Sequence, residues 1–445
     1  MKGFTRKTIL AGLIPFITSG CGSGSSSEEV TSITSVNING VPTLESIYSY
    51  EDTENAEQVV NCSTLFLESK SCDVADIKPL GADIEDDLTI EDIKSRLVVS
   101  NDWMADSFIA ALTEIDDQDL LNLFKSLNTI VISYDIIPSF YHAYTASLYI
   151  DPRYLWRDSD EWNTIYEQED YRVTYQTEFI FETLSRYIDG TTSEYITYSN
   201  SYDEDYYNSR TVPQIAPALY RLLSHELAHA NDYLPADTLS SIGDEGEIYS
   251  DYIYNADHVY EALNDAIPLS SSLLYDAAQI AYQGEDMTDT IRGTTGEDIG
   301  VEFDQDGGAA LYSYSTSRED VAMLFEEFMM YKKYGAVKDV AFTTVPSGDS
   351  YSCDDYLIEW GQRNRLADAT VKVRTELVGG IILGRDISSD LPDDSSEPIM
   401  METDIGWCES QDETTSVTTN QANSLLLRVS QSEVVVHHYQ DDIDR

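Results

Sequence analysis

The chain has 445 residues, with 26 Lys and Arg against 81 Asp and Glu and a formal net charge of −55. This length allows two or three compact units, and a content of 42% hydrophobic residues with 31 Tyr excludes a globally disordered chain. The acidic balance argues against a nucleic-acid partner, because binding to phosphates requires a positive surface.

The first residues have the composition of a secretory signal. Three basic residues precede an apolar run at 9–17, far shorter than the roughly 20 residues that cross a bilayer as a helix. The small residues before Cys21 resemble the lipobox of bacterial lipoproteins. This resemblance implies that residues 1–20 are a signal peptide. It also implies that lipidated Cys21 anchors the chain in the cell envelope, on the outer membrane and facing the periplasm or the surface. An ordinary cleaved signal peptide is the alternative.

A tether and a helical region are expected next. Residues 21–45 are rich in Ser, Thr, Gly and Glu, which predicts a flexible tether. Residues 46–128 are expected to form an N-terminal helical region, with helical spacing of apolar residues from 86 to 127. Within it, Thr89-Ile-Glu-Asp92 has the form of a capping box and favours the start of a helix.

Strands are expected after residue 128. The β-branched run at 129–134 and the run at 145–150 predict two short strands. Residues 157–212 carry little periodicity and are expected to form loops, with one helix near 179–187.

The second half of the chain has a mainly helical pattern. Helices are expected at 217–233, 247–263, 271–282, 319–333 and 356–378. The acidic stretch 384–421 contains two Pro and predicts a surface excursion, and the apolar runs within 425–436 predict a closing hairpin. Strands followed by a helix-rich block predict an α+β fold.

The cysteines predict disulfides. Five Cys less a lipidated Cys21 leave an even number, as expected in an oxidising compartment. Of three possible pairings we favour Cys62 with Cys72, which closes a short loop, and Cys353 with Cys408, which pins a long polar segment. A structural zinc site is the alternative, although the sequence contains no C-x-x-C spacing.

One sequence motif contains most of the residues that are expected to bind a metal ion or take part in catalysis. His225-Glu-Leu-Ala-His229 lies in the apolar helix expected at 217–233. Two His at i and i+4 face the same side of a helix and can share a metal ion. Glu226 lies beside that face and can act as a general base toward a metal-activated water. The structural alternative is a pair of His that merely pack within the helix.

This motif resembles that of the zincin metallopeptidases, which bind zinc through both His and a later residue. The continuation after His229 lacks the Gly and His of the metzincins, so a carboxylate third ligand of the gluzincin type is expected. Glu247 lies in an E-x-x-S-D sequence similar to the ligand helix of thermolysin-like enzymes. Glu319 lies in a segment, starting at Tyr312, that resembles the anthrax-lethal-factor-like gluzincins. The second similarity fixes more positions and favours Glu319.

The resemblance implies a zincin-like domain at 129–345, built from a small sheet and the metal helix with helix-rich additions. In this domain His225, His229 and Glu319 bind Zn²⁺, and Tyr312 faces the reacting carbonyl. The strand at 145–150 is expected to be the edge that binds an extended substrate.

Two further expectations concern the rest of the chain. Residues 346–445 are expected to form a C-terminal helix and hairpin region, pinned by the second disulfide. Asp232 is expected either to hydrogen-bond His229 behind the metal or to be a solvated carboxylate at a helix end.

The expected function is zinc-dependent hydrolysis of a peptide or protein substrate by a lipid-anchored metallopeptidase, with Glu226 as general base. Three alternatives stay open. One is a catalytically silent zinc-binding surface lipoprotein that acts as an interaction module. The others are a protein that binds no metal and a hydrolase of another amide. The sequence leaves the oligomeric state open.

Overall fold

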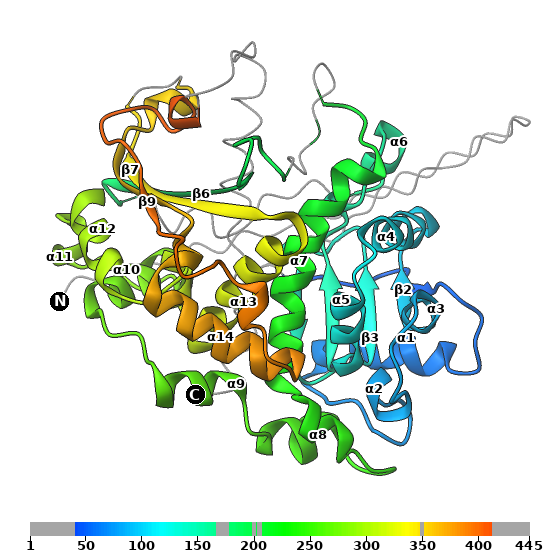
Figure 1. Ribbon diagram of the computed structural model, residues 1–445. Helices are drawn as coiled ribbons and strands as arrows, with labels where there is room; N and C mark the ends of the chain where they lie inside the picture. The colour runs from blue at the N-terminus through cyan, green and yellow to red at the C-terminus, as the bar shows by residue number, and fades with distance from the viewer. Residues whose placement is uncertain (1–40, 166–177, 198–201, 203–206, 348–350, 412–445) are drawn as a thin grey trace, which may run out of the picture. The chain divides into compact units, whose positions relative to one another are not determined.

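The computed structural model describes residues 41–165, 178–197, 202, 207–347 and 351–411. These residues form two small sheets and many helices, which confirms the predicted α+β class (Figure 1). Among them, no helix has both the length and the apolar composition needed to cross a membrane. Cys21, most of the expected tether and the hairpin expected at 425–436 lie outside the described residues.

The first sheet has the strand order β1-β2-β3-β5-β4. Its strands are β1 (Tyr48–Ser49), β2 (Leu97–Val99), β3 (Thr129–Ile132), β4 (Phe140–His142) and β5 (Ser147–Ile150). Strands β2, β3 and β5 run parallel, and β1 and β4 are antiparallel edge strands. The strands predicted at 129–134 and 145–150 are therefore confirmed as β3 and β5.

The position of the edge differs from the prediction. Residues 145–150 are not the edge, because β5 lies between β3 and β4 and pairs with both. The true edge, β4, has only three residues, too few to show a strand periodicity of its own.

Several helices precede or lie between these strands in the chain. They are α1 (Ala56–Thr64), α2 (Leu80–Asp83), α3 (Ile90–Lys94), α4 (Asp102–Ile115) and α5 (Gln118–Leu123), and α6 (Ser159–Trp162) follows β5. Of these helices, α1 and α4 contact the sheet. The predicted capping box is confirmed, since Thr89 and Asp92 exchange side-chain-to-backbone hydrogen bonds at the start of α3. The predicted division between residues 128 and 129 falls between β2 and β3, which are neighbours in one sheet.

The second sheet is antiparallel and has the order β6-β7-β8-β9. Its strands are β6 (Phe181–Asp189), β7 (Ala336–Thr344), β8 (Ile358–Arg363) and β9 (Ile399–Met400). The helix predicted near 179–187 is wrong, because every residue of β6 pairs with β7. The helix predicted at 356–378 is wrong in its first part, which forms β8. Helix α14 (Ala369–Leu383) begins only after the N-cap Asp368.

The remaining helices follow β6 in the chain. They are α7 (Val212–Tyr233), α8 (Ala236–Ser240), α9 (Val259–Ala266), α10 (Ser272–Gln283), α11 (Asp289–Arg292), α12 (Gly296–Gln305) and α13 (Ser317–Tyr334). Helices α7, α10 and α13 confirm predictions, although α7 begins at Val212, after a capping box of Thr211 and Gln214. The helix predicted at 247–263 is wrong in its first half, which forms two short turns before α9. Helix α7 packs against α13 and also contacts β4 and β5 (Figure 1).

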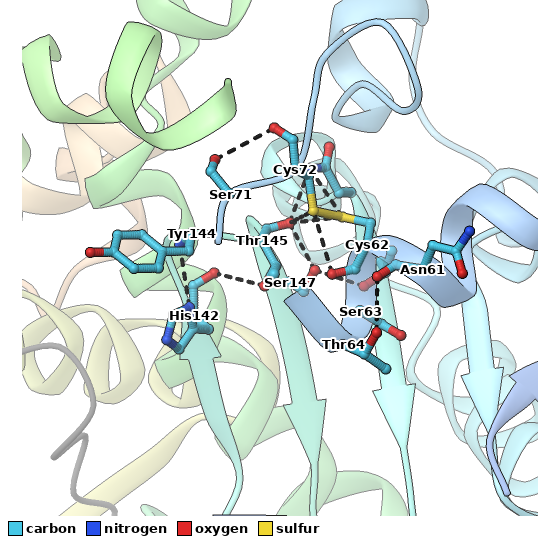
Figure 2. The surroundings of a disulfide bond; sticks show 12 residues. Asn61, Cys62, Ser63, Thr64, Ser71, Cys72, His142, Tyr144, Thr145 and Ser147 are labelled. Atoms are coloured by element: carbon cyan, nitrogen blue, oxygen red, sulfur yellow. Dashed lines mark hydrogen bonds between the residues drawn. A yellow bond between two sulfur atoms is a disulfide. The ribbon is translucent and has the colours of Figure 1, made fainter. Parts of the chain in front are cut away.

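Both predicted disulfides are confirmed, Cys62 with Cys72 and Cys353 with Cys408. Figure 2 shows the first bond beside the turn between β4 and β5, where the backbone N–H of Cys72 donates to the carbonyl of Tyr144 at 3.1 Å. The second bond joins the segment before β8 to the segment after β9.

Candidate metal centre

Three side chains from two helices meet at one buried point. His225 and His229 on α7 hold their Nε2 atoms 3.3 Å apart. Glu319, in the first turn of α13, places Oε2 3.0 Å from Nε2 of His225 and 3.4 Å from Nε2 of His229. None of the three residues is more than 2% exposed. The fold thus brings together the ligand set predicted from the sequence.

Local sequence explains why these side chains converge. Helix α7 is buried on nearly every side. Leu219, Leu223 and Leu227 cover one face, and His225 and His229 lie on the roughly opposite face of a helix that packs against α13. Helix α13 begins after Thr316, whose hydroxyl accepts a hydrogen bond from the backbone N–H of Glu319 at 3.1 Å. This cap fixes Glu319 in the first helical turn.

The donor set fits a metal ion. Tetrahedral bonds of about 2.0–2.2 Å to nitrogen and oxygen place neighbouring ligand atoms roughly 3.3–3.6 Å apart. The three separations of 3.0–3.4 Å are close to this spacing. Two imidazoles and a carboxylate also leave one tetrahedral position for another ligand. In the described part of the chain, the other group of possible ligands includes Cys353 and Cys408, which are bonded to each other.

The charges at the centre support the same conclusion. Burial lowers the pKa of His225, but hydrogen bonds to the Glu319 and Glu326 carboxylates outweigh it and raise the pKa to about 10. Burial lowers the pKa of His229, opposed by Glu319. In the metal-free chain a proton on His225 therefore neutralises part of the carboxylate charge, and a bound cation would replace that proton.

Glu226 lies beside the ligands and is fully buried. Burial raises the pKa of its carboxyl group to about 8, although the charge of His225 and a hydrogen bond from the backbone N–H of Tyr141 oppose the shift. A pKa near neutrality suits a group that both accepts and donates protons. Tyr141 belongs to β4, so the edge strand lies next to this carboxyl group.

Tyr312 also lies at the centre. Its ring is nearly parallel to that of His225, with an interplanar angle of 18° and 6.2 Å between ring centroids. Tyr314, two residues further along, instead packs near Phe303, with ring centroids 6.4 Å apart. Both tyrosines are buried, and Tyr312 is the one against a ligand.

Asp232 has a different environment from the one expected at a solvated helix end. It is fully buried, and its carboxylate accepts from the backbone N–H of Tyr260 at 2.8 Å and pairs with Arg318. Arg318 immediately precedes Glu319, and Asp232 lies three residues after His229. The ion pair therefore joins the two helices that carry the ligands.

Glu247, the competing third ligand, lies elsewhere. Its side chain is exposed and accepts a hydrogen bond from Ser250 at 3.1 Å. It does not belong to the cluster of His225, His229 and Glu319. Of the two candidates, only Glu319 reaches the histidines.

The sequence analysis missed Glu326. Its Oε2 lies 3.3 Å from Nδ1 of His225, and its Oε1 accepts from the hydroxyl of Tyr187 at 2.8 Å. Burial opposes ionisation of Glu326, but the nearby charges of Arg221, His225 and Lys338 prevail and lower its pKa to about 2. The available signal was its position seven residues after Glu319, two turns along the same face of α13.

Comparison of the chain with family models, curated proteins and solved structures finds no match. The chemistry of the centre must therefore be inferred from its own residues. It combines a group of three that can hold a metal ion with a buried carboxyl group and a buried phenol. Such a combination is compatible with metal-assisted hydrolysis.

Proposed function

We propose that this chain is a zinc-dependent peptidase of the gluzincin type, anchored in the cell envelope through lipidated Cys21. The observation that carries the proposal is the convergence of His225, His229 and Glu319, at 3.0–3.4 Å, beside the buried carboxyl group of Glu226. Zinc is favoured because His and carboxylate ligands in a tetrahedral arrangement with one open position are typical of catalytic zinc sites.

Glu226 and Tyr312 would act together with the zinc ion in hydrolysis. When bound, zinc supplies a Lewis acid that polarises the scissile carbonyl and lowers the pKa of water. Glu226 takes a proton from the attacking water and passes it to the leaving amine, for which its pKa of about 8 is suitable. The hydroxyl of Tyr312 donates to the oxygen that becomes negative in the transition state.

An extended peptide would bind beside the edge strand β4, whose three residues are themselves buried. Its residue Tyr141 donates a backbone hydrogen bond to Glu226, so a peptide lying beside β4 would pass close to the general base. Pairing through backbone groups tolerates many side chains. The proposed substrate is therefore an extended segment of a peptide or protein.

Zinc content and peptide hydrolysis test the proposal together. Elemental analysis of the purified chain should give about one zinc, lost in His229→Ala and Glu319→Ala and kept in the control Glu247→Ala. Glu226→Gln should keep the zinc and lower the hydrolysis of a fluorogenic peptide library by about 100-fold or more.

Two results would contradict this function. If the chain takes up no zinc on reconstitution, His225 and His229 have only a structural role. A zinc-loaded chain whose activity is unchanged in Glu226→Gln does not use this base. Zinc binding without any hydrolysis would instead identify a silent zinc-binding module.

A further inference from the structure

A cavity of about 330 Å³ lies beside the segment that carries Tyr312 and Glu319. It is formed by the end of α9, the start of α10 and the start of α13, and none of the metal ligands lines it. Eight of its eleven lining residues carry hydroxyl groups. Its size is at the lower end of the range for small-molecule sites.

The cavity runs from solvent to a polar floor. Tyr275 at its rim is 54% exposed, and Ser272 beside it is also exposed. The floor includes Ser313 and Asp320, each only 1% exposed. A ligand can therefore enter from solvent and reach buried polar groups.

The floor offers both donors and acceptors. Ser313 Oγ has no hydrogen-bond partner among the described residues, which is costly for a buried hydroxyl. Ser317 Oγ accepts from Asn264 at 2.8 Å, which leaves its own O–H to donate. The Asp320 carboxylate pairs with Arg374, and carboxylate oxygens can accept further hydrogen bonds.

The charge of the cavity favours a neutral ligand. No Lys, Arg or His is among the described residues that line it, so an anion would find no cation there and would face Asp320. The field of a chain with net charge −55 opposes anions as well. A cationic ligand would gain little electrostatic attraction, because Arg374 already neutralises Asp320.

We infer that this cavity binds a neutral, polyhydroxylated small molecule of about monosaccharide size. Hydroxyl groups of such a ligand donate to Asp320 and accept from Ser313 and Ser317, and the exposed ring of Tyr275 covers an apolar face of the ligand. The ligand would rest on residues 313–320, whose other contacts include the metal centre. This inference does not depend on peptidase activity.

Calorimetric titration of the full chain tests it, with D-glucose, N-acetyl-D-glucosamine and myo-inositol as probes and inorganic phosphate as comparison. At least one neutral probe should bind saturably, with one molecule per chain. Ser313→Ala should weaken binding by about fivefold, as expected for one lost hydrogen bond. Ser272→Trp, which fills the rim, should abolish it.

Ser107→Ala is the matched control, because Ser107 is another buried serine without a hydrogen-bond partner among the described residues, on α4. It should leave binding unchanged, which separates loss of the site from loss of stability. Absence of saturable binding by all three neutral probes overturns the inference. Binding that is unaffected by Ser313→Ala and Ser272→Trp, or binding of phosphate alone, also overturns it.

Discussion

At the scale of single residues, Glu326 occupies the side of His225 that faces away from the other ligands. Its carboxylate lies 3.3 Å from Nδ1 of His225 and is held by Tyr187 of β6. A carboxylate at this position would keep the proton of the imidazole on Nδ1 and direct the lone pair of Nε2 toward the proposed metal ion. In the proposed zinc site Glu326 would thus position His225 and would not itself be a ligand.

Glu326→Gln should weaken zinc binding by about 10- to 100-fold, because the neutral amide orients and polarises His225 less well. The neighbouring Glu327 is the matched control. It is equally buried, but its carboxylate accepts from the backbone N–H of Leu366 at 3.1 Å. Competition with a chelator gives the zinc affinity of both variants. Equal losses in Glu326→Gln and Glu327→Gln would show that burial of charge, and not contact with His225, decides the affinity.

Burial of His142 on β4 should make the protein less stable at acidic pH. Burial lowers its pKa to about 3, whereas the unfolded chain has an imidazole pKa of about 6.5. Between these values the unfolded state binds one more proton than the folded state, so the free energy of unfolding falls as the pH drops from 6.5 toward 3. The slope from this residue is about 1.4 kcal/mol per pH unit.

Urea unfolding of the metal-free chain from pH 8 to pH 4 measures this slope. In His142→Asn, whose amide oxygen can still accept from the backbone N–H of Tyr144, the dependence on pH should be shallower by up to one proton. Any loss of packing affects both ends of the pH range equally. Parallel curves for the two proteins would refute a neutral, buried His142.

At the scale of elements, α13 is held at both ends. Near its first turn, Arg318 pairs with the buried Asp232 of α7 and stacks on Tyr233 and Tyr260, 3.5 and 4.3 Å from the ring centroids. At the other end of α13, Lys332 pairs with Asp117 and Asp119 at the start of α5. Helix α13, which carries the proposed third ligand Glu319, thus has little freedom to move relative to α7.

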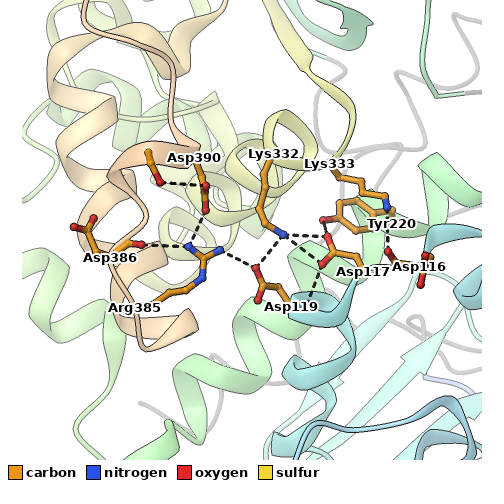
Figure 3. Close-up of polar contacts among 10 residues, drawn as sticks. Asp116, Asp117, Asp119, Tyr220, Lys332, Lys333, Arg385, Asp386 and Asp390 are labelled. Carbon is orange, nitrogen blue, oxygen red and sulfur yellow. Dashed lines mark hydrogen bonds and ion pairs between the residues drawn. The ribbon is translucent and has the colours of Figure 1, made fainter.

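Figure 3 shows the second clamp. Lys332, in the last turn of α13, lies 3.2 Å from a carboxylate oxygen of Asp117 and 3.0 Å from one of Asp119. Arg385, just after α14, bridges Asp119 at 2.8 Å and Asp390 at 2.7 Å. These contacts connect α5 with α13 and with the segment after α14.

Of the two arginines, Arg318 should matter more for stability than Arg385. Arg318→Met leaves the carboxylate of Asp232 buried without its ion-pair partner, which should lower the free energy of unfolding by about 3–5 kcal/mol. Arg385→Met, the control, breaks more exposed pairs and should cost about 1 kcal/mol or less. Chemical denaturation measures both. Adding Asp232→Asn to Arg318→Met should restore part of the loss, and the absence of any recovery would argue against an uncompensated charge as its cause.

The elements also show what the sequence can and cannot predict. Helices α7 and α13 are amphipathic or capped within their own sequence, so local periodicity was sufficient to predict them, and the spacing of His225 and His229 was sufficient to pair the two histidines. The choice of Glu319 came from the resemblance of its segment to the anthrax-lethal-factor-like gluzincins. Strand β6 was predicted as a helix. Its pairing partner β7 lies about 150 residues away in the chain, so the local sequence pattern contains no information about that pairing. The contact of Glu326 with His225 depends likewise on how two distant helices pack.

At the scale of the whole molecule, charge sets the conditions under which the fold is stable. Even if every Lys and Arg paired with one carboxylate, the net charge of −55 would stay uncompensated. In addition, some of the basic residues are buried and do not compensate surface carboxylates. Arg365 and Arg374 are fully buried and bind backbone carbonyls of the segment before Tyr312. The surface is thus left with excess carboxylates that repel one another, more strongly in the folded chain than in the expanded unfolded chain.

Salt should therefore stabilise this protein. Raising NaCl from about 0.02 M to about 0.5 M shortens the Debye length from roughly 20 Å to roughly 4 Å and screens repulsion between surface carboxylates. The melting temperature of the metal-free chain at pH 7.5, measured by calorimetry, should rise by several degrees. At pH 4.5 part of the carboxylates are protonated, so the same addition of salt should have a smaller effect. A melting temperature that falls with salt at pH 7.5 would mean that ion pairs such as Lys332 with Asp117 outweigh the repulsion of the surface. An equal rise at both pH values would mean that screening of carboxylate repulsion is not its cause.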